Sequence, residues 1–198
     1  MDPTIAILAA GSSSRMRGGD KLLEQVNGIP LLRSLAIRAL EVGLPVMVTL
    51  PEAGPRHSAL SGLQVKRVPV PDAATGMSAS FRAIGRSVLN RPVLCMLGDM
   101  PDIENTDLKH IHRSFLGDPD RVHRATSDDG RWGQPVLFPA RLVARFATLT
   151  GDKGARSLLR REDVIPVPLP GERAITDLDT PEDWTAWRTA RESRDGLD

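Results

Sequence analysis

Residues 5–21 read IAILAAGSSSRMRGGDK, and this stretch decides which fold and which kind of ligand the chain is expected to have. An apolar run of strand length leads into small residues, which let a ligand approach the backbone closely. Two fixed cations, Arg15 and Lys21, follow this turn. A strand, an open turn and nearby cations together predict a cradle for phosphate groups.

The spacing of this turn excludes two common phosphate cradles. A P-loop requires Gly-x-x-x-x-Gly-Lys-Ser/Thr and a dinucleotide fold requires Gly-x-Gly-x-x-Gly, and the turn matches neither. The pattern that is present, Leu-Ala-Ala-Gly-x-Ser-x-Arg-Met followed by Lys, resembles the signature of nucleotidyltransferases that form nucleotide-diphospho compounds. The alternative is a Gly/Ser-rich surface turn after an edge strand, which Arg15, Met16 and Lys21 disfavour.

The composition predicts one domain spanning residues 1–198, without a general affinity for polyanions. Because 26 Lys and Arg residues nearly balance 25 Asp and Glu residues, no overall field attracts nucleic acid or an anionic membrane. No apolar run approaches the ~20 residues of a membrane span, and we recognise no signal-peptide pattern. We therefore expect a cytoplasmic protein, and we favour a monomer.

Cysteine and histidine are assigned to packing or to the surface. The single cysteine, Cys95, lies inside the apolar run of residues 93–97, which is typical of a buried structural thiol. No Cys or His group has the spacing of a zinc site. The scattered histidines interpreted in this way are His57, His110, His112 and His123.

Strand-length apolar runs alternate with amphipathic segments of helix length along most of the chain. This alternation predicts an α/β fold with a mostly parallel sheet and helices on both faces. Strands are expected at residues 4–9, 45–50, 64–69, 93–97, 123–127, 134–138 and 164–168. Helices are expected at residues 30–42, 77–89 and 155–161, from an Asn105 or Thr106 cap to residue 116, and after a Thr180 cap paired with Asp183.

Two further segments have compositions of their own. Residues 127–135 contain a turn-forming run and predict a hairpin-like excursion, which we interpret as a lid over an acceptor site. Residues 188–198 are rich in both charges and predict a solvated helix end that frays.

Acidic residues stand at two places where a cation would be expected. Asp99 ends the apolar run of residues 93–97, and the carboxyl ends of parallel strands are where open α/β sheets bind ligands. Asp177 and Asp179 alternate in an extended segment, so both face the same side. Together they form the all-oxygen ligand set that Mg²⁺ prefers. The alternatives, a turn residue at Asp99 and a helix-entry residue at Asp179, stay open at this point.

Two weaker motifs complete the pattern. Residues 70–80 leave a strand, turn at Gly76 and enter a helix with Ser78 and Ser80 in its first turn, which suits the recognition of a base and a ribose. Capping alone explains Ser78 equally well. Residues 131–138 place a polar turn before a strand and suit contact with a second substrate, although a plain hairpin explains them as well.

Taken in this order, the motifs resemble the molybdenum cofactor nucleotidyltransferases. The resemblance extends over residues 5–183 and is most specific at residues 8–16, 98–101 and 177–183. It implies a single NTP transferase domain with a twisted, Rossmann-like sheet of the nucleotide-diphospho-sugar transferase kind, and an Mg²⁺ ion. It also implies transfer of a nucleoside monophosphate to the terminal phosphate of molybdopterin, with release of pyrophosphate.

The resemblance and the charges of the reactants assign roles to individual residues. Arg15, Lys21 and Asp99 are expected to be catalytic, and Asp99, Asp179 and Asp177 to hold the metal. The nucleotide is expected to bind Leu8, Ala9, Ala10, Gly11, Ser12, Ser13, Arg15, Lys21, Pro71, Asp72, Gly76, Ser80 and Asp99. The acceptor is expected to bind Trp132, Gln134 and Pro135.

The nucleotide and the reaction have alternatives. Ala9-Ala10, Pro71-Asp72 and residues 98–101 resemble the cytidylyl branch, whereas the spacing from Met16 to Lys21 and Gln134 resemble the guanylyl branch, so we favour CTP over GTP. A sugar-phosphate or alcohol-phosphate nucleotidyltransferase shares the cradle and the acids. A chaperone that hands the cofactor to a molybdenum hydroxylase is the alternative from a different class.

Overall fold

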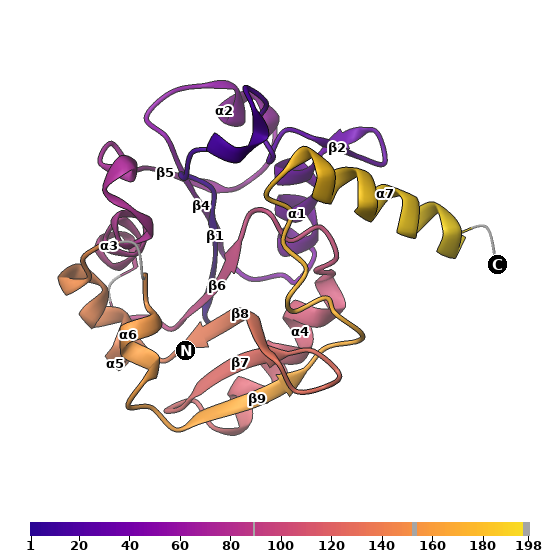
Figure 1. Cartoon of the computed structure of the whole chain (residues 1–198). Coiled ribbons are helices and arrows are strands. Elements are labelled where there is room, and N and C mark those ends of the chain that lie inside the picture. The colour runs from indigo at the N-terminus through magenta and orange to yellow at the C-terminus, as the bar shows by residue number, and fades with distance from the viewer. Residues whose placement is uncertain (89, 152–153, 196–198) are drawn as a thin grey trace.

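The computed structural model describes residues 1–88, 90–151 and 154–195, and its main sheet has seven strands in the order β5-β4-β1-β6-β8-β7-β9 (Figure 1). In chain order these strands are β1 (Thr4–Leu8), β4 (Val46–Leu50), β5 (Lys66–Pro69), β6 (Val93–Leu97), β7 (Val122–Thr126), β8 (Trp132–Phe138) and β9 (Val164–Pro168). β8 runs antiparallel to β6 and β7, and the other pairings in this sheet are parallel. The predicted mostly parallel sheet is confirmed.

The central strands form where the sequence is continuously apolar. β1 and β4 are buried along their whole length, as parallel strands are when helices cover both faces of a sheet. Alternate residues of β1 enter opposite cores: Ile5 and Ile7 belong to one apolar cluster, and Ala6 and Leu8 to the other. The seven predicted strands are all present, with ends that differ by at most two residues.

A small hairpin outside the main sheet was not predicted. β2 (Gln25–Val26) and β3 (Ile29–Pro30) pair antiparallel around Asn27 and Gly28, whose φ angles are 52° and 79°. Positive φ at both positions is the requirement of the tight hairpin turn that Asn-Gly favours, so this dipeptide is the signal that could have predicted it.

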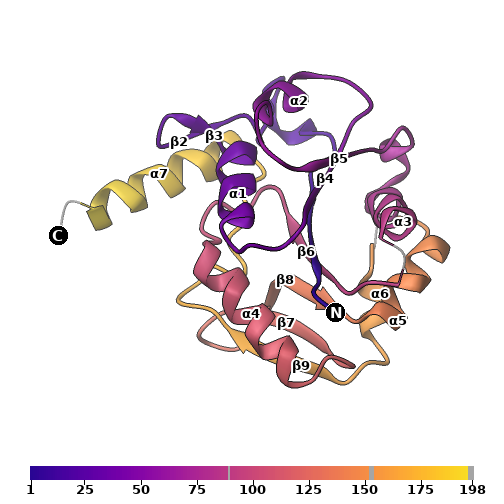
Figure 2. The same ribbon diagram turned by 180° about the vertical axis from the view of Figure 1, so that it is seen from behind.

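Helices cover both faces of the main sheet (Figures 1 and 2). One core contains residues of α1 (Leu31–Leu40), α4 (Asn105–Gly117) and α7 (Pro181–Asp195); the other contains residues of α3 (Met77–Ser87), α5 (Ala140–Val143) and α6 (Arg156–Leu159). The remaining short elements are η1 (Ser14–Met16), α2 (Pro55–Ala59), η2 (Ala73–Thr75) and η3 (Ala144–Thr148). None of the described helices combines the length and the apolar composition needed to cross a membrane.

The helix ends follow the predicted capping chemistry with one correction. The Thr180 Oγ accepts the N–H of Asp183, and the Asp183 carboxylate accepts the N–H of Thr180, so the predicted capping box of α7 is confirmed. The predicted cap of α4 is wrong by one residue or more, because Glu104 caps it and Asp107 completes the box.

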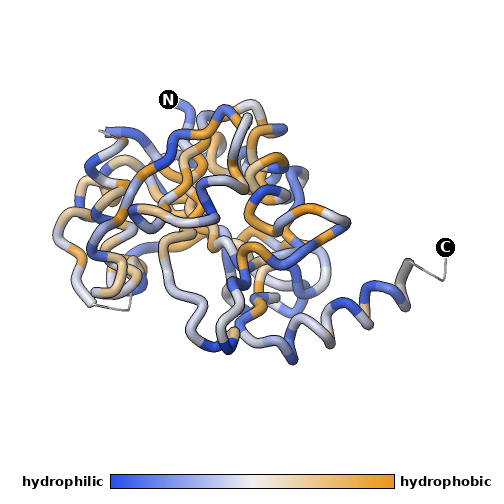
Figure 3. The backbone as a smooth tube through the Cα atoms, turned by 90° about the horizontal axis from the view of Figure 1, so that it is seen from above, coloured by the Kyte–Doolittle hydropathy of each residue, from blue (hydrophilic) through white to orange (hydrophobic). Residues whose placement is uncertain are grey.

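Two predicted helix ends involve residues outside the described part of the chain. The helix predicted at residues 77–89 is α3, and Leu89 is not among the described residues. α7 continues to Asp195 and so includes most of the segment expected to fray, while residues 196–198 lie outside the description. The far end of α7 projects away from the body of the protein (Figure 3). Arg188 on this helix pairs with Glu24 at 2.6 Å.

Candidate active site

The carboxyl ends of β1 and β6 lie side by side, and this brings Asp99 next to the glycine loop. The N–H of Gly98 donates to the carbonyl oxygen of Leu8 at 3.0 Å. A β-carbon on Gly98 would lie 3.0 Å from the same oxygen, so glycine permits the close approach of the two strand ends. Asp99 therefore lies at the edge where open α/β sheets bind ligands.

A cleft of about 700 Å³ opens at this edge of the sheet. Most residues predicted to bind the nucleotide line it: Leu8, Ala9, Ala10, Gly11, Ser12, Arg15, Lys21, Gly76, Ser80 and Asp99. Ser13, Pro71 and Asp72 do not line it. The glycine loop and the turn before α3 thus face one common space.

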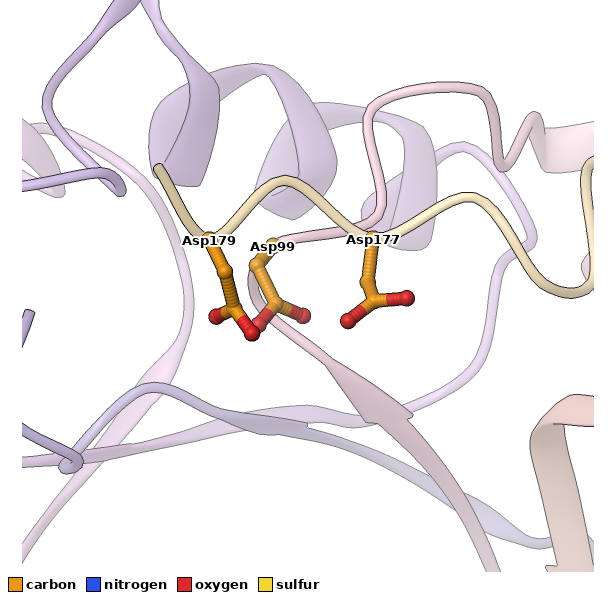
Figure 4. A group of neighbouring side chains, drawn as sticks. All are labelled: Asp99, Asp177 and Asp179. Atoms are coloured by element: carbon orange, nitrogen blue, oxygen red, sulfur yellow. The ribbon is translucent and has the colours of Figure 1, made fainter. Parts of the chain in front are cut away.

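The three predicted metal ligands converge beside this cleft. One carboxylate oxygen from each of Asp99, Asp177 and Asp179 lies within 4.8 Å of the others. Figure 4 shows the three side chains pointing the same way from two separate segments. The N–H of Leu178 donates to the carbonyl oxygen of Asp99 at 3.1 Å, which joins the later segment to the end of β6.

Lys21 and Arg15 lie against these acids. The Lys21 Nζ is 2.5 Å from Asp99 Oδ2 and 2.6 Å from Asp179 Oδ1, and Arg15 pairs with the other oxygen of Asp179. Burial alone would lower the pKa of Lys21, but Asp99 and Asp179 outweigh it and raise that pKa above its usual value. Lys21 therefore stays protonated and offsets the negative charge of the cluster.

The acid cluster fits a hard divalent cation. Asp99 Oδ1 is buried and has no hydrogen-bond partner among the described residues, so one lone-pair acceptor in the cluster is unsatisfied. Burial, and then the charges of Asp99 and Asp179, raise the pKa of Asp177. An all-carboxylate donor set with a buried, unpartnered oxygen suits Mg²⁺ or Mn²⁺.

Arg56 is a site residue that the sequence analysis missed. Its side chain is only 6% exposed, and one guanidinium nitrogen donates to the carbonyl oxygens of Ala9 and Gly11, both at 2.7 Å. The Nε and the other nitrogen bind Asp20 at 2.7 and 2.9 Å. No local motif marks Arg56, because its partners are distant in the chain. It fixes the shape of the glycine loop from α2.

Ser13, which is predicted to bind the nucleotide, does not line the cleft, and its hydroxyl is part of this clamp. Its Oγ donates to Asp20 at 3.1 Å and accepts the N–H of Lys21 at 3.2 Å. Burial alone would raise the pKa of Asp20, but its bonds to Arg56 and to the Leu22 N–H lower it overall. Asp20 is therefore ionised, and the loop is held before any ligand binds.

Asp72 and Pro71, which are also predicted to bind the nucleotide, lie outside the cleft lining. Asp72 pairs with Arg82 of α3 at 2.5 Å, and this hydrogen bond holds the pKa of the carboxyl below its usual value. Pro71 is exposed in the preceding turn. Asp72 thus joins the turn to α3. Gly76 and Ser80, at the start of this helix, line the cleft.

The residues predicted to bind the acceptor are separated. Gln134 lines a second cavity of about 380 Å³, which Trp132 and Pro135 do not line. Trp132 is 47% exposed on β8, and Pro135, three residues further along this strand, is buried. β7 and β8 form the predicted hairpin. Arg131 in its turn pairs with Asp129 and Glu172.

The strand that carries Gln134 touches the segment that carries the acids. The N–H of Gln134 donates to the carbonyl oxygen of Ala174 at 2.7 Å. A β-carbon on Gly133 would lie 1.9 Å from that oxygen. Only glycine allows these two segments to lie this close, and Ala174 is three residues before Asp177.

The cysteine and the histidines do not line the nucleotide cleft. Cys95 is buried, and burial raises the pKa of its thiol. His123 is fully buried, and its ring is hydrogen-bonded to the Ser114 hydroxyl and the carbonyl oxygen of Asp118. His123 therefore serves packing, as predicted.

The fold is an α/β sheet with a cleft at the carboxyl ends of its parallel strands, where such sheets bind ligands. Comparison with known proteins gives the family. The chain belongs to the MobA-like NTP transferase domain family, whose model matches residues 5–165. It is therefore an enzyme of the nucleotidyltransferase class. A search of curated proteins gave no significant match.

Solved structures share the fold of this chain. Rv0371c from Mycobacterium tuberculosis H37Rv superposes with a TM-score of 0.80 at 26% identity, covering 94% of this chain and 97% of that one. The manganese complex of Rv0371c gives 0.75 at 25% identity, with the same coverage. The molybdopterin-guanine dinucleotide biosynthesis protein A of Archaeoglobus fulgidus gives 0.70 at 14% identity, covering 96% and 99%, and shares the fold.

Proposed function

We propose that the protein transfers CMP from CTP to the terminal phosphate of molybdopterin and releases pyrophosphate. The observation that carries this proposal is the convergence of Lys21, Asp99 and Asp179, with Nζ–O distances of 2.5 and 2.6 Å, beside a glycine-loop cleft. Family membership supports nucleotidyl transfer. The choice of CTP depends on Ala9-Ala10 and on the other cytidylyl-like motifs of the sequence.

Both reactants are anions, so the site has to neutralise and align them. Arg15 and Lys21 line the cleft and bind the triphosphate and then the leaving pyrophosphate. The glycine loop contributes backbone N–H groups, since Arg56 occupies the carbonyl oxygens of Ala9 and Gly11. These groups stabilise the charge that develops on the leaving group.

Asp99 and Asp179 would hold a divalent cation, for which we propose Mg²⁺, with Asp177 as a further ligand or an orienting acid. Such an ion supplies positive charge to the phosphate oxygens. The manganese complex of Rv0371c supports a divalent metal in a similar protein. Gly76 and Ser80 at the start of α3 line the cleft and suit contact with the nucleoside.

The chemistry requires no covalent nucleophile from the protein. A phosphate oxygen of the acceptor forms a bond to the α-phosphorus, and the bond from that phosphorus to the bridging oxygen of pyrophosphate breaks. The protein's contribution is therefore positioning and charge.

The test is pyrophosphate release from protein incubated with Mg²⁺, molybdopterin and each of the four common NTPs, with a reaction lacking molybdopterin as the control. We expect release with CTP that depends on molybdopterin. A single-turnover competition between CTP and GTP then fixes the nucleotide. Release with a pyranose 1-phosphate and none with molybdopterin would reject the proposal and favour a sugar-phosphate nucleotidyltransferase.

A further inference from the structure

The second cavity adjoins the nucleotide cleft. Leu8, Met77 and Leu97 line both spaces, so a ligand in one touches the boundary of the other. The second cavity lies over β6, β8 and β7 on the face that α3 and α6 cover, and its volume is about 380 Å³. A molecule in this cavity would therefore lie beside the cleft that holds Asp99.

The wall of this cavity carries positive charge over an apolar floor. Phe81, Val136 and Phe138 supply apolar surface, and Arg124 and Arg156 supply the two charged groups. None of the described residues that line it carries a carboxylate. Two guanidinium groups without a lining acid create a site for an anion.

The two arginines are held differently. Arg124 on β7 is half-buried; its Nε donates to the carbonyl oxygen of Gly133 at 2.9 Å, and its guanidinium carbon lies 5.5 Å from the centre of the Trp132 ring. Arg156 is exposed at the start of α6, and it forms no ion pair or hydrogen bond with the described residues. Burial, and then the nearby charge of Arg156, lower the pKa of Arg124, so the two cations repel each other.

We infer that Arg124 and Arg156 bind the phosphate monoester group of the acceptor and position it for attack. This inference rests on the proposed function and adds to it the residues that recognise the attacking group. Arg15 and Lys21 line the nucleotide cleft, whereas Arg124 and Arg156 line the second cavity, so each reactant has its own cations. The repulsion between Arg124 and Arg156 is relieved when a dianion lies between them.

This arrangement balances the reaction. The monoester oxygen forms the new bond to the α-phosphorus, and pyrophosphate leaves with the electron pair of the bond that breaks. A phosphate dianion has no proton to remove, which agrees with a cavity whose charged groups are arginines, because arginine is a poor proton acceptor. Arg124 and Arg156 are thus positioning residues for the acceptor, in a cavity that Gln134 also lines.

Arg156→Gln is the decisive variant, because the Arg156 side chain forms no ion pair or hydrogen bond with the described residues. Its matched control is Arg161→Gln, an exposed arginine close by in the chain that does not line the cavity. Arg156→Lys keeps the charge and loses the planar fork. Two measurements are needed. The first gives the separate KM values for molybdopterin and for CTP. The second uses pterin fluorescence to measure equilibrium binding of molybdopterin and of its dephosphorylated form.

We expect Arg156→Gln to raise the KM for molybdopterin and weaken its binding about tenfold, and to change the KM for CTP less than about twofold. Dephosphorylated molybdopterin should bind wild type and Arg156→Gln equally. Arg156→Lys should recover part of the loss, and Arg161→Gln should match wild type. A loss that is the same for both forms of the ligand, or a rise in the KM for CTP instead, would overturn the inference.

A failure of the proposed function is distinguishable from a failure of this inference. If wild type releases no pyrophosphate with molybdopterin and any NTP, the proposed acceptor is wrong. Calorimetric titration with inorganic phosphate, in saturating CTP and EDTA, then tests whether Arg124 and Arg156 form an anion site. Weaker phosphate binding by Arg156→Gln than by Arg161→Gln supports the anion site for another phosphate monoester, and equal binding rejects it.

Discussion

The glycine loop and the second cavity both present arginine near a proposed anion, yet the two regions are built in opposite ways. Arg56 is almost fully buried and binds two loop carbonyls and Asp20. Arg156 is exposed and makes no ion pair among the described residues. The loop is therefore shaped before a ligand arrives, whereas the cavity keeps its charge available.

The difference indicates that arginines which stabilise the fold and arginines which recognise a ligand are separate residues in this protein. Preorganisation lowers the cost of binding, and it suits the polyphosphate, the part that every nucleoside triphosphate shares. A cation that holds nothing in the protein can be exchanged with little effect on folding. We expect substitutions in the loop to reduce stability or turnover strongly, and substitutions around the cavity to alter acceptor affinity alone.

Arg56→Ala is the strongest challenge to the view of the loop as prebuilt. It leaves Asp20 and two carbonyl oxygens without their partner, so we expect a loss of about 3–5 kcal/mol in the free energy of unfolding, measured with urea. Arg86→Ala, an exposed arginine on α3, is the control and should change stability by less than about 0.5 kcal/mol. An Arg56→Ala protein as stable as wild type would show that the clamp does not shape the loop.

Asp99→Asn tests whether the strand-end acid serves catalysis. By analogy with the loss of one oxyanion-hole donor, removing this electrostatic group should lower kcat/KM about 10²–10³-fold, or about 2.7–4 kcal/mol, measured by pyrophosphate release. Lys21→Ala should have a similar effect. Asp163→Asn, an exposed acid far from the cluster, serves as control. Near-normal turnover with unchanged magnesium dependence in both variants would remove Asp99 and Lys21 from the mechanism.

The decrease of the free energy of unfolding at low pH tests the contribution of Asp20 to the glycine loop. Because its folded pKa lies below the unfolded value, the ionised carboxylate stabilises the protein above the unfolded pKa, near 3.9, and this contribution is lost as the pH falls through the lower folded pKa. Asp20→Asn should lower stability at pH 7 by about 1.5–3 kcal/mol and make this decrease less steep. Urea unfolding from pH 3 to pH 7 measures both. An unchanged slope would contradict the role of Asp20.

Trp132→Ala should have the smallest effect. Its ring contacts Arg124 near the surface, a contact that contributes about 0.5–1 kcal/mol, so we expect the KM for the acceptor to rise about two- to fivefold and the KM for CTP to stay constant. Leu116→Ala, an exposed apolar residue on α4, is the control. Complete loss of turnover would instead mean that Trp132 contacts the acceptor directly, as the sequence predicts.

The sequence predicts the parts of the fold and site that depend on local patterns. Continuous apolar runs mark buried parallel strands, and an acid after such a run marks Asp99, since chain direction alone brings strand ends to one edge. The alternation of Asp177 and Asp179 likewise needs no tertiary information. Asn27-Gly28 was an available signal that the prediction did not use.

The missed features depend on partners far apart in the chain. Arg56 meets Asp20 and Ala9 only because α2 folds over the loop, and no spacing rule marks such a pair. Asp72 lies in a motif that suits nucleotide binding, but its carboxylate pairs with Arg82, which is 10 residues away in the chain. Arg124 and Arg156 come from β7 and from the start of α6, which only the tertiary fold brings to one cavity.

Gly133 lies where β8 contacts the segment that contains Ala174 and leads to the acid cluster. Because its α-carbon leaves no room between β8 and Ala174, we expect a displacement of the hairpin to shift the segment that leads to Asp177 and Asp179. We therefore expect a ligand that fills the second cavity to influence the placement of the carboxylates. A methyl group at position 133 would therefore act like a wedge, spoiling the alignment of two sites while removing no charged group from either.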